Sequence, residues 1–136
     1  MEGQALASEL ETAQRLVEAL EEKEILKLKL LTRPIKTIVV VFNAVSLLLG
    51  YREQSWTHTR STILDDFNQL LKKFNASDSY IDANKIKELR SKYTRNDESR
   101  FCFDRKKAEK ISKPTAIIIR WIEAVDNFVT FRVARE

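Results

Sequence analysis

Apolar residues recur at alternating intervals of four and three near both ends of this 136-residue chain. The N-terminal series is Leu6, Leu10, Ala13, Val17 and Leu20, and the C-terminal series is Ile118, Ile122, Val125 and Val129. This spacing places each series along one stripe of an α-helix and is typical of a coiled-coil seam. It predicts one continuous helix over residues 1–33 and another from residue 115 to the C-terminus.

Two seam helices on either side of a middle segment pair most simply as an antiparallel coiled coil, with both chain ends on the same side. We therefore predict an all-α fold in three parts. These are an outgoing stalk helix over residues 1–33, a small globular tip of short helices over 34–113, and a returning stalk helix over 114–136. The alternative is a plain helical bundle with no projecting stalk.

The N-terminal seam changes phase near residue 24. Continuing its count reaches Glu24 and Lys27, which are poor seam residues, and a shifted stripe of Ile25, Leu28 and Leu31 takes over. Such a change either over- or underwinds a coiled coil locally, or marks a helix end that docks onto a globular body. The sequence leaves both interpretations open.

Shorter helices are predicted within the middle segment. An apolar helix over residues 35–49 follows Pro34 and ends before Gly50, which is placed as a C-cap. One or two short amphipathic helices are predicted over 56–71, with a pair of aspartates as caps before Phe67. Further predicted features are a polar loop over 75–82, a basic helix marked by Ile86, Leu89, Arg90 and Tyr93, and a helix that begins after Asp104.

Composition argues against several classes of protein. Two glycines cannot supply a Rossmann fingerprint, a P-loop or the turns of a β-sandwich, and Cys102, the single cysteine, forms neither an internal disulfide nor a cysteine zinc site. His58 is the single histidine. We expect no catalytic residues, no metal and no cofactor. The apolar stretch over 38–49 is too short to span a membrane, and the acidic N-terminus does not resemble a secretory leader.

The excess positive charge lies in one stretch. The chain has a net charge of +4, yet residues 85–113 alone hold 11 basic and 5 acidic side chains, whereas residues 1–33 are net acidic. A concentrated basic surface favours an acidic partner, such as nucleic acid, an anionic membrane or an acidic protein polymer. The plainer interpretation is a solvated helix face.

Four segments together resemble the microtubule-binding domain of dynein heavy chains with the distal part of the stalk. They are residues 13–34 with the proline at the end of the outgoing helix, residues 41–50 ending in Leu49-Gly50, residues 55–74 with Trp56, and residues 103–128 with Trp121. The sequence departs from the family in several ways, and one of them is that a proline within the outgoing stalk helix is missing. Pro34 is followed by Ile35 where a second proline is usual, and Val39 and Asn43 stand where the cytoplasmic type has a lysine and an acid.

The resemblance implies reversible binding to α/β-tubulin in microtubules, with affinity set by the register of the stalk. The parent motor would hydrolyse ATP in a distant ring, so this chain would be a non-catalytic part located in the cytoplasm and cytoskeleton or in the axoneme of a cilium or flagellum. We expect basic side chains to contact the acidic microtubule. The predicted contact residues are Lys36, Arg52, Lys85, Lys87, Arg90, Arg105, Lys106, Lys107 and Lys110.

Two other functions compete with this hypothesis. A basic helical adaptor would bind nucleic acid or a coiled-coil partner, although no RNA-recognition, zinc-finger or basic-zipper pattern is present. A membrane-surface module has less support, because no predicted helix joins a basic face to an exposed aromatic face. We expect neither a membrane nor a small-molecule substrate as a partner, and we favour tubulin over nucleic acid.

Overall fold

The computed structural model describes residues 2–31, 36–51, 55–64, 67–74, 83–89, 110 and 112–134. All regular structure in these ranges is helical, which confirms the all-α class. The elements are α1 (Glu2–Glu18), α2 (Glu22–Lys29), α3 (Lys36–Leu48), α4 (Trp56–Thr59), the π-helix η1 (Arg60–Leu64), α5 (Phe67–Lys73), α6 (Ala83–Leu89) and α8 (Lys113–Ala134).

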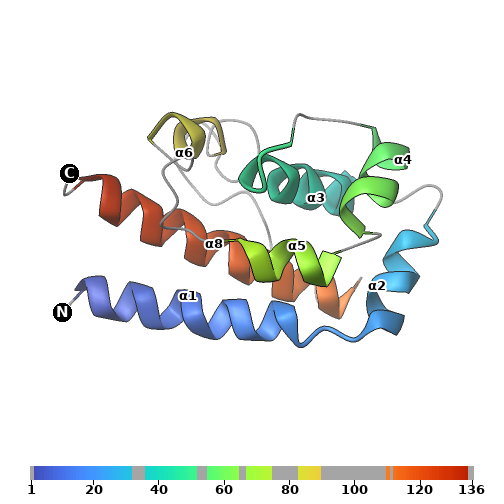
Figure 1. Cartoon of the computed structure of the whole chain (residues 1–136), viewed down its shortest axis with the longest axis horizontal. Coiled ribbons are helices and arrows are strands. Elements are labelled where there is room, and N and C mark those ends of the chain that lie inside the picture. Colours follow the sequence, from blue (N-terminus) through green and yellow to red (C-terminus); the bar gives the residue numbers. More distant parts are fainter. Residues whose placement is uncertain are drawn as a thin grey trace.

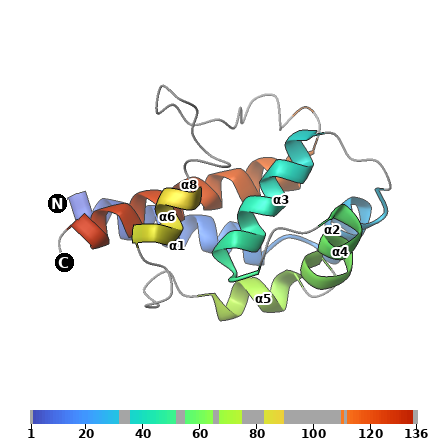
Figure 2. The same ribbon diagram turned by 90° about the horizontal axis from the view of Figure 1, so that it is seen from above.

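The two terminal helices pack against each other more extensively than any other two elements. They run side by side in opposite directions, so that both chain ends lie at the same end of the molecule (Figures 1 and 2). Ala13 and Val17 of α1 are fully buried, as are the seam residues of α8. An ion pair also joins the two helices. The Arg120 guanidinium of α8 donates to both carboxylate oxygens of Glu9 of α1 at 2.8 and 3.2 Å, and both side chains are partly exposed.

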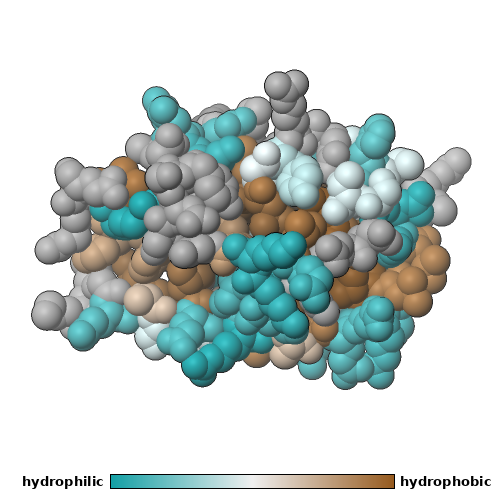
Figure 3. Space-filling model, in the orientation of Figure 1, coloured by the Kyte–Doolittle hydropathy of each residue, from teal (hydrophilic) through white to brown (hydrophobic). Residues whose placement is uncertain are grey.

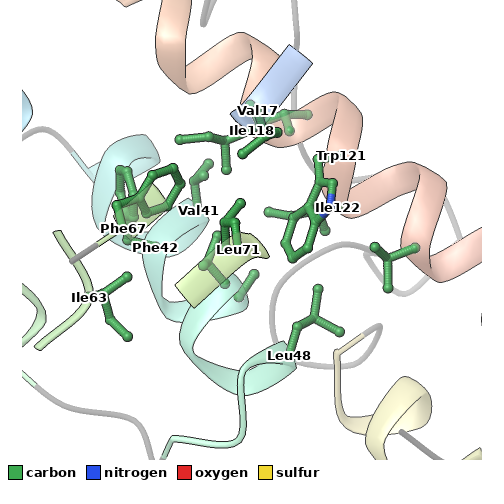
Figure 4. Close-up of a cluster of buried hydrophobic side chains, with 14 of the residues drawn as sticks. Val17, Val41, Phe42, Leu48, Ile63, Phe67, Leu71, Ile118, Trp121 and Ile122 are labelled. Atoms are coloured by element: carbon green, nitrogen blue, oxygen red, sulfur yellow. The ribbon is translucent and has the colours of Figure 1, made fainter. Parts of the chain in front are cut away.

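The shorter helices lie along this pair and share its core. Contacts join α3 and α6 to α8 and join α5 to α1. Phe74, just after α5, packs edge-on against Trp121 of α8, with ring centroids 5.0 Å apart. Figure 4 shows the buried side chains that meet here, from α1 (Val17), α3 (Val41, Phe42, Leu48), η1 (Ile63), α5 (Phe67, Leu71) and α8 (Ile118, Trp121, Ile122).

The prediction of one continuous helix over residues 1–33 is wrong. Helix α1 ends at Glu18, and α2 begins at Glu22 after a break. At the break, Leu20 N–H bonds back to the Val17 carbonyl at 3.2 Å, and Glu21 N–H donates to the Glu24 carboxylate at 3.1 Å. The break follows from the change of phase in the seam, because an uninterrupted helix would turn Glu24 toward the core in place of Ile25.

Helix α3 agrees with its prediction at both ends of the described range. It is followed by Gly50 at φ 91°, a left-handed conformation that glycine adopts without steric cost. Gly50 N–H bonds to the Leu47 carbonyl at 3.1 Å, and Tyr51 N–H bonds to the Ser46 carbonyl at 2.8 Å. This pair of bonds is a Schellman motif, which confirms the predicted C-cap.

Two short helices and a π-helical turn follow. The Ser55 hydroxyl caps α4 by accepting from His58 N–H at 3.4 Å. Helix α5 starts at Phe67, as predicted. Phe42 of α3 lies between this segment's rings, with its centroid 5.9 Å from that of Trp56 and 6.1 Å from that of Phe67. These edge-on contacts seat the segment on α3.

Helices α6 and α8 match two further predictions within the described residues. Ile86 and Leu89 of α6 are buried. Helix α8 begins at Lys113, two residues before the expected start, because Pro114 is tolerated in a first turn whose N–H groups have no intrahelical acceptor. Several predicted features lie outside the described residues, namely Asp65, Asp66, the 75–82 loop, Arg90, Tyr93, Cys102 and the helix after Asp104.

Candidate partner-binding surface

Helix α6 carries two of the basic residues predicted to contact the microtubule, Lys85 and Lys87. Its buried residues Ile86 and Leu89 are three positions apart and face α3 and α8. Lys87 therefore points away from the core and is exposed, whereas Lys85 is half-buried and engaged with other groups of the chain. Of the two, Lys87 has the side chain that a partner reaches more easily.

A second group of basic residues, Lys110 and Lys113, lies at the start of α8. Ser112 caps this helix, because its hydroxyl accepts from Thr115 N–H at 3.3 Å and its carbonyl accepts from Ala116 N–H at 3.2 Å. Thr115 and Ala116 are buried, whereas Lys110 and Lys113 are exposed. The N-terminal end of a helix dipole is positive, so it adds to the positive charge of these two lysines. An anionic partner would therefore interact favourably with both the lysines and the helix end.

The structure separates these two groups of basic residues. Helix α8 has 22 residues and is about 33 Å long at 1.5 Å per residue. Helix α6 lies over the half of α8 nearer the chain termini, and the start of α8 lies at the opposite end (Figures 1 and 2). The predicted residues Lys85 and Lys87 therefore do not share a patch with Lys110.

The other predicted contact residues are described in part or not at all. Lys36 opens α3, but its side chain lies outside the described part. Five more predicted residues lie outside the described ranges altogether. These are Arg52, Arg90, Arg105, Lys106 and Lys107.

Sequence reasoning missed the lysines of α2, because residues 1–33 are net acidic as a whole. Lys23 and Lys27 are exposed on this helix, on the face opposite the buried Ile25 and Leu28. The signal that could have found them was the shifted stripe itself. Once Ile25 and Leu28 face inward, the 3.6-residue period turns Lys23 and Lys27 outward.

A groove of about 380 Å³ lies along α1, between Phe74 and Phe128. Leu10 and Ala7 contribute to its apolar lining, and charged side chains of α1 stand at its margin. The complete lining is Ala7, Leu10, Glu11, Gln14, Arg15, Glu18, Phe74 and Phe128. Ion pairing between Arg15 and Glu11 on this face is exposed and contributes little to stability.

His58 lies next to the N-cap of α4. Its Nδ1 lies 3.0 Å from the Ser55 hydroxyl, and both residues are exposed. The pair belongs to the first turn of α4, where Ser55 is the N-cap. Within the described ranges, no three His, Cys, Asp or Glu side chains gather as ligands for a metal ion.

No helix in the described part of the chain is both long enough and apolar enough to cross a membrane. Comparison with known proteins gives no family assignment, since no family model and no curated protein matches the chain.

Proposed function

We propose that this chain is the microtubule-binding tip of a dynein heavy chain, carried on the distal end of its coiled-coil stalk. The observation that carries the proposal is the antiparallel pairing of α1 with α8. It brings both chain ends together at one end and leaves the lysines at the start of α8 at the other. In this proposal the pair continues as the stalk, and the far end of the bundle meets the filament.

Residues that carry the resemblance to dynein also have structural tasks that suit a tip. Gly50 terminates α3, and Trp121 is fully buried at the α1–α8 pair. The Trp56 indole donates to the Leu31 carbonyl at 2.7 Å and so ties the segment after α3 to the chain beyond α2. The resemblance therefore rests on residues that hold the tip to its two terminal helices.

The proposed contact is electrostatic and reversible. Exposed lysines attract an acidic filament and speed encounter, and salt weakens that attraction. Of the predicted contacts, Lys110 lies at the end of the bundle far from the termini, and Lys113 beside it joins the set. No step of catalysis is assigned to this chain, because ATP hydrolysis belongs to the ring of the parent motor.

The break between α1 and α2 offers a place where the state of the motor could reach the filament contact. Residues 19–21 shift the buried stripe from one phase to another, and we propose that a second pairing of α1 with α8 exists at a similar free energy. A difference in filament affinity between such states of about 1–3 kcal/mol is enough for coupling.

Co-sedimentation of the full chain with polymerised tubulin tests the proposal, with salt raised from ~0.05 to ~0.3 M. We expect binding that weakens as salt rises. Reversing the charge of Lys110 and Lys113 to Glu should weaken binding about tenfold or more. The matched control reverses Lys72 and Lys73, which are exposed on α5 and are not proposed contacts.

A second set of variants addresses the predicted residues outside the described ranges. Charge reversal of Arg105, Lys106 and Lys107 should also weaken co-sedimentation. Binding that is indifferent to both sets of reversals would rule out the electrostatic mechanism. Preferential binding of RNA in a competition with tubulin would favour the basic adaptor instead.

A further inference from the structure

Helix α2 has an outward face that combines leucines with lysines. Leu26 is 49% exposed and Leu30 is 68% exposed, the two largest values among large apolar side chains of the described residues. Lys23 and Lys27 share this face, because the four residues recur at intervals of three, one and three. Leu30 caps the C-terminal end of the helix. The buried residues Ile25 and Leu28 occupy the opposite side.

This face is held in place by bonds behind it. The Trp56 indole donates to the Leu31 carbonyl at 2.7 Å, and the Arg60 guanidinium donates to the Lys29 carbonyl at 3.3 Å. The Lys29 carbonyl ends α2 and the Leu31 carbonyl lies just beyond it, where helix geometry leaves acceptors without intrahelical donors. Because α2 is tied to α4 and η1 at its end, the leucines are presented outward by a fixed helix.

The charge of the face is positive. Its four side chains are two lysines and two leucines, and it has no carboxylate. Lys23 contacts Glu21 at 3.2 Å, but both side chains are more than half exposed, so this ion pair is weak and readily exchanged for another carboxylate. The face is therefore complementary to a surface on which apolar side chains stand between acidic ones.

Its position matches the proposed filament contact. Helix α2 lies at the end of the bundle away from both chain termini, the same end as the start of α8 (Figures 1 and 2). In Figure 3 apolar surface is visible at this end, where Figure 1 places α2. We infer that Leu26 and Leu30, flanked by Lys23 and Lys27, form an apolar docking surface for the acidic filament, an inference that rests on the proposed function.

An apolar docking surface responds to salt differently from a contact made by lysines alone. Salt screens the attraction between exposed charges, but it does not weaken burial of apolar surface. Part of the affinity should therefore survive at the high end of the salt series, and that part should depend on the two leucines. Replacing only Lys23 and Lys27 should reduce the salt dependence while leaving this residual binding.

The experiment uses the full chain and polymerised tubulin at ~0.05 and ~0.3 M salt. The double variant Leu26→Ser, Leu30→Ser should bind about tenfold more weakly at both salt concentrations. The matched control is Leu16→Ser, which removes a 37% exposed leucine from α1 and should bind like the unmodified chain. Helical circular dichroism and the unfolding midpoint of each variant verify that the fold is intact.

The outcomes separate the two proposals. Unmodified chain that does not co-sediment overturns the proposed function and this inference with it. Unmodified chain that binds, with the double leucine variant binding equally well, overturns the docking surface and leaves the proposed function standing. Leucine-dependent binding to phosphatidylserine vesicles, with none to microtubules, would assign the face to a lipid surface and also overturn the inference.

Discussion

The indole N–H of Trp121 donates to the side-chain carbonyl oxygen of Gln14 at 2.6 Å, across the paired terminal helices. The same amide continues the chain of bonds, because its Nε2 donates to the Leu71 carbonyl at 2.7 Å. One glutamine thus joins α1, α8 and α5. Trp121 is fully buried, so its N–H has no water to replace a lost partner.

Replacing Gln14 with Leu should destabilise the fold by about 1–3 kcal/mol, because the buried Trp121 N–H loses its partner. The Leu71 carbonyl keeps a bond from Phe74 N–H at 3.2 Å. Chemical denaturation followed by tryptophan fluorescence measures the change. The companion variant Trp121→Phe removes the donor and the ring edge together. If Gln14→Leu unfolds at the same denaturant concentration as the unmodified chain, the bond contributes nothing.

The ion pair between Glu9 and Arg120 should contribute much less. Both side chains are more than one-third exposed, so a double-mutant cycle with Glu9→Gln and Arg120→Gln should give a coupling energy of at most about 1 kcal/mol, falling as salt rises. A coupling well above that value, or one that salt does not change, would contradict the expectation.

The same pair predicts how stability responds to alkali. The hydrogen bonds that Arg120 donates to the Glu9 carboxylate raise the pKa of Arg120 above its ordinary value. A cation with a raised pKa stabilises the fold below its unfolded pKa, and that contribution is lost only above it. The stability difference between the unmodified chain and Arg120→Gln should therefore be the same at about pH 7 and about pH 9. Thermal unfolding at the two pH values measures it.

Replacing Gly50 with Ala should destabilise the fold by about 1–2 kcal/mol, because alanine resists a left-handed backbone. Steric crowding adds nothing, since an added Cβ at Gly50 would meet no atom within 4 Å. Gly50→Asn should cost less, because asparagine tolerates this region better. Equal losses for the two variants, measured by denaturation, would point to a cause other than backbone conformation.

The break before α2 should depend on Glu24. Its carboxylate accepts from Glu21 N–H at 3.1 Å, so Glu24→Ala should weaken the first turn of α2 by about 0.5–1 kcal/mol. Hydrogen exchange of the Glu21 amide reports the loss directly. The exposed neighbour Glu22 is the matched control, and Glu22→Ala should leave that amide's exchange rate unchanged.

Local signals made part of the fold predictable. The helical period identified which residues of the terminal seams are buried, and Gly50 marked the end of α3 because few other residues accept a left-handed backbone. The phase change in the N-terminal seam was visible as well. Its structural outcome was not, because a wound coiled coil and a broken helix bury the same stripes.

The candidate surface was predictable only in outline. Charge counting located a basic stretch, but it averaged the lysines of α2 against nearby acids and could not separate the two ends of α8. The shifted stripe of Ile25 and Leu28 turns Leu26 and Leu30 outward with Lys23 and Lys27, but it does not show whether another segment covers them. Exposure depends on which segments pack against the helix, and Trp56 and Arg60 bond to the end of α2 from 25 and 31 positions away along the chain.

The amino-acid sequence by itself determined that the chain is helical, where α3 stops, and which stripes of the terminal helices turn inward. Each of these depends on residues within a turn or two of one another. Tertiary structure alone decided that Gln14 bridges three helices and that Trp56 and Arg60 bond to the C-terminal end of α2. Those features follow from packing between distant segments, whose relative placement no local pattern encodes.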